Sequence, residues 1–284
     1  MGRLLKAFFF KLSRDLTFRI TLIIGAGIAV LMTGIYLAID LTGASEAGVS
    51  LAEYGNKLLT GPTMLVASLS PAQNYGLAIP VNVISFICLE FTQGSIRNKI
   101  IAGNSKLNIF ISLFISGLIF CFALLGVYVL LCTGIGSIFG GFNVHGDYLL
   151  GGNYSPEYLI KFVILSLLVY ASIVAFTVFI ATTFRSVGPS IPIVIVVIVM
   201  VYLLGSLVSG ILALFEKNET LVWVLRIIDP MYGISSSELK VVDEYYSEMT
   251  ITNETFISGI CSNLFYIALF FFFGALEFRK RDVK

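Results

Sequence analysis

Charged side chains are scarce in this chain. They make up 12% of its 284 residues, whereas apolar residues make up 57%. Soluble domains carry about twice that charged fraction, and a single soluble core could not bury so much apolar surface. The composition therefore excludes an ordinary soluble domain and predicts a membrane protein.

The sequence also lacks the motifs of several common activities. It has one histidine, His145, no H-E-x-x-H, and no G-x-x-x-x-G-K-[ST] phosphate loop. No basic stripe with interleaved aromatic residues indicates nucleic-acid binding. The chain is therefore expected to have no enzymatic activity by itself and to hold no cofactor or metal. The cysteines are expected to act as apolar side chains rather than as metal ligands or in disulfides; they are Cys88, Cys121, Cys132 and Cys261.

About six apolar stretches are long enough to cross a hydrocarbon core of roughly 30 Å as helices. We therefore predict an all-α membrane protein with a single transmembrane domain, residues 1–284. A short interfacial or re-entrant piece is expected just before the second span, in which Pro80 should kink the helix. The spans are expected at about Ile20–Ile39, Tyr75–Phe91, Leu107–Leu131, Leu159–Phe184, Ile191–Phe215 and Phe256–Phe278.

Basic residues are distributed unevenly between the two sides of these spans. The positive-inside rule assigns the richer side to the cytoplasm, together with both termini. That side holds Arg3, Lys6, Lys11, Arg14, Arg19, Arg97, Lys99, Lys106, Arg185, Arg279, Lys280, Arg281 and Lys284. The other side holds Lys57, Lys161, Lys217, Arg226 and Lys240.

Three segments outside the spans have a distinct composition. Residues 1–19 are predicted to form an amphipathic interfacial helix that contacts lipid, or alternatively a plain basic anchor. Its apolar face comprises Leu5, Phe8, Phe9, Leu12 and Leu16. On the outer side, a Gly-rich loop is expected over Thr133–Tyr158, and residues 216–254 form a long acidic loop.

The link between the second and third spans, residues 92–106, is the most informative segment. Ser95 is expected to cap a short helix that stops at Gly103. The apolar face of this helix is expected to comprise Ile96, Ile100 and Ile101, opposite Arg97 and Asn98. Such a helix could contact lipid, or it could dock into the groove of a partner.

The run Glu90–Asn98, E-F-T-Q-G-S-I-R-N, resembles the segment after the second span in the ABC type-2 permease family. These proteins are the membrane subunits of bacterial ABC exporters. The basic N-terminal helix and the F-x-x-R-D ending at Phe278–Asp282 are similar as well. The resemblance implies a permease that pairs with a second copy of itself or with a related permease. A separate cytoplasmic ATP-binding subunit, with ATP and Mg²⁺, would drive it.

The resemblance also implies roles for particular residues. The helix around Gly94–Ala102 would be the coupling helix seated on the ATPase, and Arg185 would make a second contact. The implied coupling residues are Glu90, Gly94, Ser95, Ile96, Arg97, Asn98, Lys99, Ile100 and Ile101.

The spans contain few ionisable groups, so the expected substrate is apolar or amphipathic, such as a peptide toxin, a lantibiotic or a drug. The expected location is the bacterial plasma membrane. The alternative hypothesis is a non-transporting sensor or assembly module that binds a partner through its outer loops.

Overall fold

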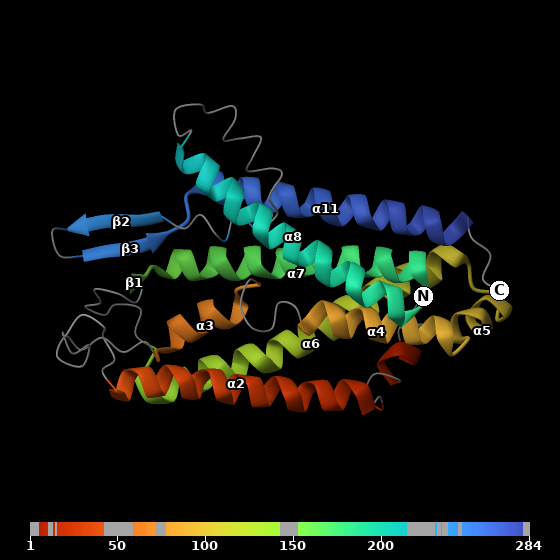
Figure 1. Cartoon of the computed structure of the whole chain (residues 1–284), viewed down its shortest axis with the longest axis horizontal. Coiled ribbons are helices and arrows are strands. Elements are labelled where there is room, and N and C mark those ends of the chain that lie inside the picture. The colour runs from red at the N-terminus through yellow and green to blue at the C-terminus, as the bar shows by residue number, and fades with distance from the viewer. Residues whose placement is uncertain are drawn as a thin grey trace.

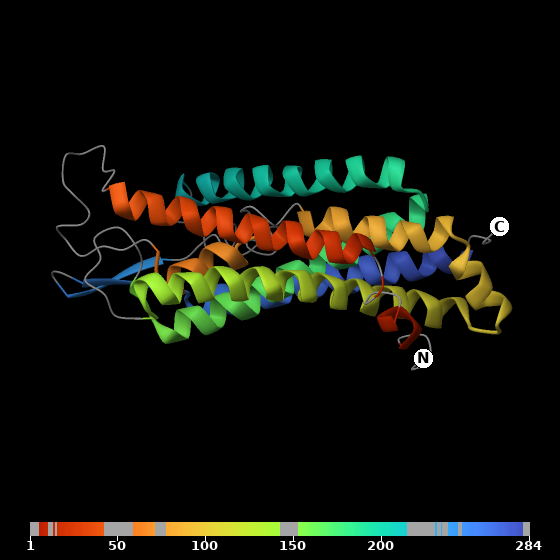
Figure 2. The same cartoon turned by 90° about the horizontal axis from the view of Figure 1, so that it is seen from below.

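The computed structural model describes residues 6–10, 14, 16–42, 59–71, 78–142, 153–214, 231, 234, 238–243 and 246–280. This part of the chain is mostly helical, and its long helices run side by side (Figures 1 and 2). Four helices are long and apolar enough to cross a membrane, and the bent pair α4–α5 would make a fifth. The protein is therefore a helical membrane protein with four to five candidate spans.

Three helices match predicted spans closely. They are α2 (Leu16–Thr42), α7 (Pro156–Phe184) and α11 (Asn253–Lys280). The start of α7 follows from its sequence, because the Ser155 hydroxyl accepts a hydrogen bond from the Tyr158 amide at 3.1 Å. Pro156 then occupies the first turn, where no amide donor is needed.

The third predicted span is longer than the sequence suggested. Helix α6 runs from Lys106 to Gly140, whereas a Gly-rich loop was expected from Thr133. Its last turns pack against α3 (Gly61–Leu69). A Cβ on Gly136 would lie 2.6 Å from Cγ of Met64, so the glycine permits this close approach. The part of the expected loop that contains His145 lies outside the described residues.

Helix α3 is the short piece expected before the second span. Its nine residues extend roughly 14 Å, which is about half of a hydrocarbon core. The second predicted span is α4 (Ala78–Thr92). Pro80 lies near the first described residue of α4, and the turn before it, where the kink was expected, lies outside the described residues.

Helix α8 (Val187–Leu214) corresponds to the fifth predicted span and starts four residues earlier than Ile191. Its segment Val187–Leu203 is apolar but shorter than the four long candidates. Pro192 lies inside the helix, where its missing amide leaves one carbonyl of the preceding turn without a helical donor. Helix α8 packs against α4 and α7.

A small sheet interrupts the expected all-α fold. Strands β2 (Glu238–Asp243) and β3 (Tyr246–Thr250) pair antiparallel, and β1 (Asn153–Tyr154) pairs parallel to β3. Both Leu239 and Tyr154 are in register with Met249. The sheet lies at the end of the bundle opposite α5 (Figure 1). Most of the acidic loop predicted over 216–254 lies outside the described residues.

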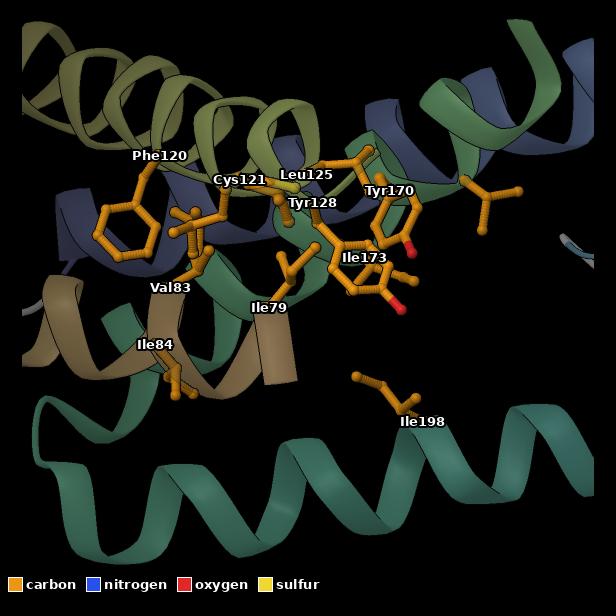
Figure 3. Close-up of a cluster of buried hydrophobic side chains, with 14 of the residues drawn as sticks. Ile79, Val83, Ile84, Phe120, Cys121, Leu125, Tyr128, Tyr170, Ile173 and Ile198 are labelled. Carbon is orange, nitrogen blue, oxygen red and sulfur yellow. The ribbon is translucent and has the colours of Figure 1, made fainter. Parts of the chain in front are cut away.

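The core between α4, α6, α7 and α8 is apolar, with a few polar contacts between helices (Figure 3). The Thr21 hydroxyl donates to Oδ1 of Asn82 at 2.9 Å, which joins α2 to α4. The Ser172 hydroxyl donates to Oδ1 of Asn263 at 3.0 Å, which joins α7 to α11. Such bonds fix the alignment of helices where lipid supplies no polar partner. Three cysteines are buried as expected, whereas Cys261 is exposed.

Candidate functional site: the elbow between α4 and α5

The helix expected after the second span is α5 (Ser95–Ile101), and it forms an elbow with α4. The two helices are bent by 55° at the break between them. Gly94 makes the corner with a φ of +68°, a left-handed conformation that costs glycine little. Its amide donates to the Phe91 carbonyl at 3.1 Å, which closes the last turn of α4.

A buried ion pair holds the elbow. The Glu90 side chain on α4 is 1% exposed, and its Oε2 lies 2.7 Å from Nζ of Lys99 on α5. A charge that leaves water is tolerated only when it is paired and hydrogen-bonded. The pair therefore joins the two arms of the elbow across its inner side.

The hydroxyl of Ser95 completes this arrangement. It hydrogen-bonds to the Glu90 carboxylate and lies 3.2 Å from the Glu90 carbonyl oxygen. Ser95 was expected to cap α5, and this was wrong, because Gly94 is the N-cap residue and supplies no side-chain bond. Ser95 is instead the first residue of α5, and its hydroxyl donates to the buried carboxylate of Glu90.

The end of α5 agrees with the sequence prediction. α5 stops where Gly103 adopts a φ of +83° and donates to the Ile100 carbonyl at 2.9 Å. Ser105 then caps α6 by accepting from the Asn108 amide at 3.2 Å. Hydrogen bonds therefore define both the end of α5 and the start of α6.

The outward face of α5 differs from the expected one. Ile96 is buried and Ile100 packs against the core, whereas Ile101 is 73% exposed. Consecutive residues are about 100° apart around a helix, so Ile101 points away from Ile100. The exposed face of α5 therefore comprises Arg97, Asn98 and Ile101, two polar residues with one apolar residue.

The N-terminal segment packs against the same elbow. Residues 6–10 are helical, and Nζ of Lys99 lies 3.6 Å from the centre of the buried Phe8 ring. Phe9 and Phe10 are exposed. Leu5 and Leu12 of the apolar face predicted for residues 1–19 lie outside the described residues, and Leu16 of the same face is exposed as the first residue of α2.

Arg185 lies beside the elbow. It ends α7 in a left-handed conformation, with a φ of +57°, and only Ser186 separates it from α8. Its guanidinium carbon is 5.9 Å from the centre of the Phe91 ring at the end of α4. The link between α7 and α8 and the link between α4 and α6 are therefore neighbours.

The ends of α6 and α11 complete this end of the bundle. Nζ of Lys106 donates to the Arg279 carbonyl at 3.2 Å, and the rings of Phe91 and Phe278 meet edge to face. The end of the bundle where α5 lies (Figure 1) thus holds the basic residues Lys99, Lys106, Arg185 and Arg279. This end is electropositive and rich in exposed polar groups.

The elbow combines a bent helix pair with an exposed face on α5. Among the described residues, no group of three or more His, Cys, Asp or Glu side chains is placed to hold a metal ion. The carboxylate of Glu90 is already bound to Ser95 and Lys99. What the elbow offers is a rigid corner and an exposed helix face.

A second feature, which was not predicted from the sequence, lies in the middle of the bundle. The hydroxyls of Ser166 and Tyr170 on α7 are buried and have no hydrogen-bond partner in the described part of the chain. They stand four residues apart in an otherwise apolar run. This helical spacing of polar groups was the available signal.

Comparison with known proteins assigns the chain to a family. No curated protein matches the chain, and no solved structure does. A family model described as "Protein of unknown function (DUF2705)" matches residues 49–284. Because this match covers far more than half of the 284 residues, the chain belongs to the DUF2705 family.

Proposed function

We propose that this chain is the transmembrane subunit of an ABC exporter. It works as a dimer, with a second copy or a related permease, and a separate cytoplasmic ATP-binding subunit hydrolyses ATP with Mg²⁺. The observation that carries the proposal is the elbow: a buried ion pair holds a short helix rigidly at the end of a span. The face of α5 with Arg97, Asn98 and Ile101 is exposed there to receive the subunit.

The elbow suits the transmission of force because it leaves little freedom between α4 and α5. Movement of the ATP-binding subunit against α5 would be passed to α4 through the Glu90–Lys99 contact of 2.7 Å. The neighbouring Arg185 gives the second contact with the same subunit. Phe8 links the N-terminal helix, which lies on lipid, to this assembly.

In this proposal α2, α4, α6, α7, α8 and α11 are the six spans. The end of the bundle that holds α5 and the cations is cytoplasmic, in agreement with the positive-inside rule. Both ends of the chain are then cytoplasmic, and the protein is located in a bacterial plasma membrane. The small sheet faces the outside.

The substrate is apolar or amphipathic, such as a peptide toxin, a lantibiotic or a drug. From Leu107 to Gly140 and from Phe162 to Phe184 the sequence contains no charged residue. A path along these helices has no group to pair with a bare ion.

The test is co-purification of the tagged permease with the ATP-binding protein encoded by a neighbouring gene. The wild-type chain is expected to retain that protein and to raise its ATP turnover. Arg97→Ala and Ile101→Asp each change a side chain that is exposed on α5, so both should weaken the retention without unfolding the chain.

Arg279→Ala is the matched control, because Arg279 is an exposed cation at the same end but on α11. It should retain the ATP-binding protein at the wild-type level. Equal retention by wild type, Arg97→Ala and Ile101→Asp would refute the docking role of α5. Absence of a gene for an ATP-binding protein beside this one would count against the proposal as a whole.

A second candidate is a membrane sensor or assembly module that does not transport. The observation in its favour is the sheet β1-β3-β2, which provides an ordered surface at the end opposite α5. Deletion of residues 238–250 should abolish partner binding in a sensor, whereas a permease would keep its ATP-binding subunit.

A further inference from the structure

Two hydroxyls in the middle of α7 are buried in an unusual way. Ser166 and Tyr170 are both 0% exposed, and neither hydroxyl has a hydrogen-bond partner among the described residues. Other buried hydroxyls of α7 donate to a carbonyl of the preceding turn, as in Ser172, Thr177 and Thr182. The pair therefore departs from the pattern of its own helix.

Such hydroxyls are costly in this environment. A buried donor that finds no acceptor loses the hydrogen bonds it would make in water. At mid-bilayer depth, lipid supplies no replacement. Both groups would therefore be stabilised by a polar occupant, and they lie four residues apart on one face of α7.

Side chains from two other helices lie close to the Tyr170 hydroxyl. Tyr128 and Cys121 of α6 belong to the same buried cluster as Tyr170 (Figure 3), and Tyr202 of α8 packs against that cluster. Figure 3 shows the hydroxyls of Tyr128 and Tyr170 pointing to the same side, where Ile198 of α8 covers the core. The Tyr202 hydroxyl donates a hydrogen bond to the Pro71 carbonyl, and Tyr202 thereby bounds this group of side chains on one side.

The surroundings decide which kind of ligand fits. The walls are apolar, with Ile79, Leu125 and Ile173 around the tyrosines. The sequences of α6 from Leu107, α7 from Phe162 and α8 up to Leu214 contain no charged residue. A charged group would find no counter-ion there, whereas a hydroxyl or an amide would find donors and acceptors.

We propose that Ser166 and Tyr170, with Tyr128 beside them, form a mid-bundle site for the neutral hydrogen-bonding group of an amphipathic ligand. The apolar part of the ligand packs among the side chains of α6, α7 and α8. The inference rests on the proposed function in that it names the polar contact for a transported substrate. The site itself requires no ATP-binding subunit.

The test uses the full chain in lipid nanodiscs and 3-azioctanol, a photoactivatable alkanol with one hydroxyl and an apolar chain. Adducts mapped by mass spectrometry are expected next to Tyr170, on α6, α7 and α8. Excess 1-octanol should displace the label and octane should not, because only the alcohol offers a hydrogen bond. Tyr170→Phe should lower this labelling roughly tenfold, which is the effect of one lost hydrogen bond. Ser166→Ala should also lower the labelling.

Tyr158→Phe is the matched control, since Tyr158 is a buried tyrosine of α7 whose ring stacks between those of Tyr154 and Phe162. It should label like the wild type. Adducts confined to exposed residues such as Leu130 and Leu203, or site labelling unchanged in both variants, would overturn the proposal. Labelling is measured without an ATP-binding protein, so its failure is distinct from a failure of the co-purification.

Discussion

The ion pair of the elbow makes a quantitative prediction. Lys99→Met removes the cation that faces Glu90 at 2.7 Å, while the carboxylate stays 1% exposed. Breaking a buried pair costs about 3–5 kcal/mol, because the remaining charge is buried without compensation. Glu90 keeps the hydrogen bond from Ser95, so we expect the lower end of that range, about 3 kcal/mol of unfolding free energy.

A double-mutant cycle separates the pair from general damage. Glu90→Gln leaves Lys99, which is 17% exposed and can turn toward solvent, so its cost should be smaller. The double variant Glu90→Gln/Lys99→Met removes both charges and should cost less than the sum, by ~1–3 kcal/mol. The assay is reversible unfolding by SDS in mixed micelles, followed by circular dichroism.

Lys280→Met is the control, because Lys280 is exposed at the end of α11. Its unfolding free energy should stay within ~0.5 kcal/mol of the wild type. Wild-type stability of Lys99→Met, or simple addition of the two single costs in the double variant, would contradict an energetic coupling between Glu90 and Lys99.

Two further predictions concern glycines, and both are measured by the same unfolding assay. Gly136→Leu should destabilise the chain by at least ~1–3 kcal/mol, because a Cβ there would lie 2.6 Å from Cγ of Met64 and 2.9 Å from the Thr60 carbonyl oxygen. Gly126→Ala on the same helix meets nothing within 4 Å and should be neutral or stabilising, so an equal loss in both would contradict the α3–α6 contact. Gly94→Ala should cost ~1–2 kcal/mol because φ is +68°, whereas Gly94→Asn should cost less; equal stability of all three proteins would contradict the left-handed corner.

The sequence predicts the helices well where their apolar character is continuous. The bounds of α7 and α11 lie within a few residues of the expected spans, because burial in lipid demands about 20 apolar residues whatever the neighbours are. The extension of α6 to Gly140 was not predictable in this way. Glycine has a low intrinsic helix propensity, so the glycines after Thr133 indicated a loop. In the structure, the small size of Gly136 allows α6 to pack closely against α3.

The elbow was located from sequence but its internal arrangement was not. Glu90, Ser95 and Lys99 were expected within the coupling segment, and all three meet. The predicted role of Ser95 as a helix cap was wrong. Serine is the residue type expected both for a cap and for a hydrogen bond to a carboxylate, so the sequence did not distinguish the two roles. The position of Ile101 was wrong because its apolar character was given more weight than its angle around the helix.

Two features depend on contacts between distant segments. Tyr154, from the predicted Gly-rich loop, pairs with Met249, from the predicted acidic loop. Neither segment has a strong β pattern in its sequence. The unpartnered hydroxyls of Ser166 and Tyr170 follow from what α6 and α8 place around them. Local periodicity does not show the strand pairing, and the four-residue spacing of Ser166 and Tyr170 does not show that their hydroxyls lack partners.

The central claim, that α5 docks on an ATP-binding subunit, is tested most directly by site-specific photocrosslinking in cells. Benzoylphenylalanine incorporated in place of Ile101, which is 73% exposed, should capture a soluble ATP-binding protein. The same amino acid in place of Leu130, an exposed residue of α6, should capture none. Capture at Leu130 alone, or capture of only lipid at Ile101, would contradict the account.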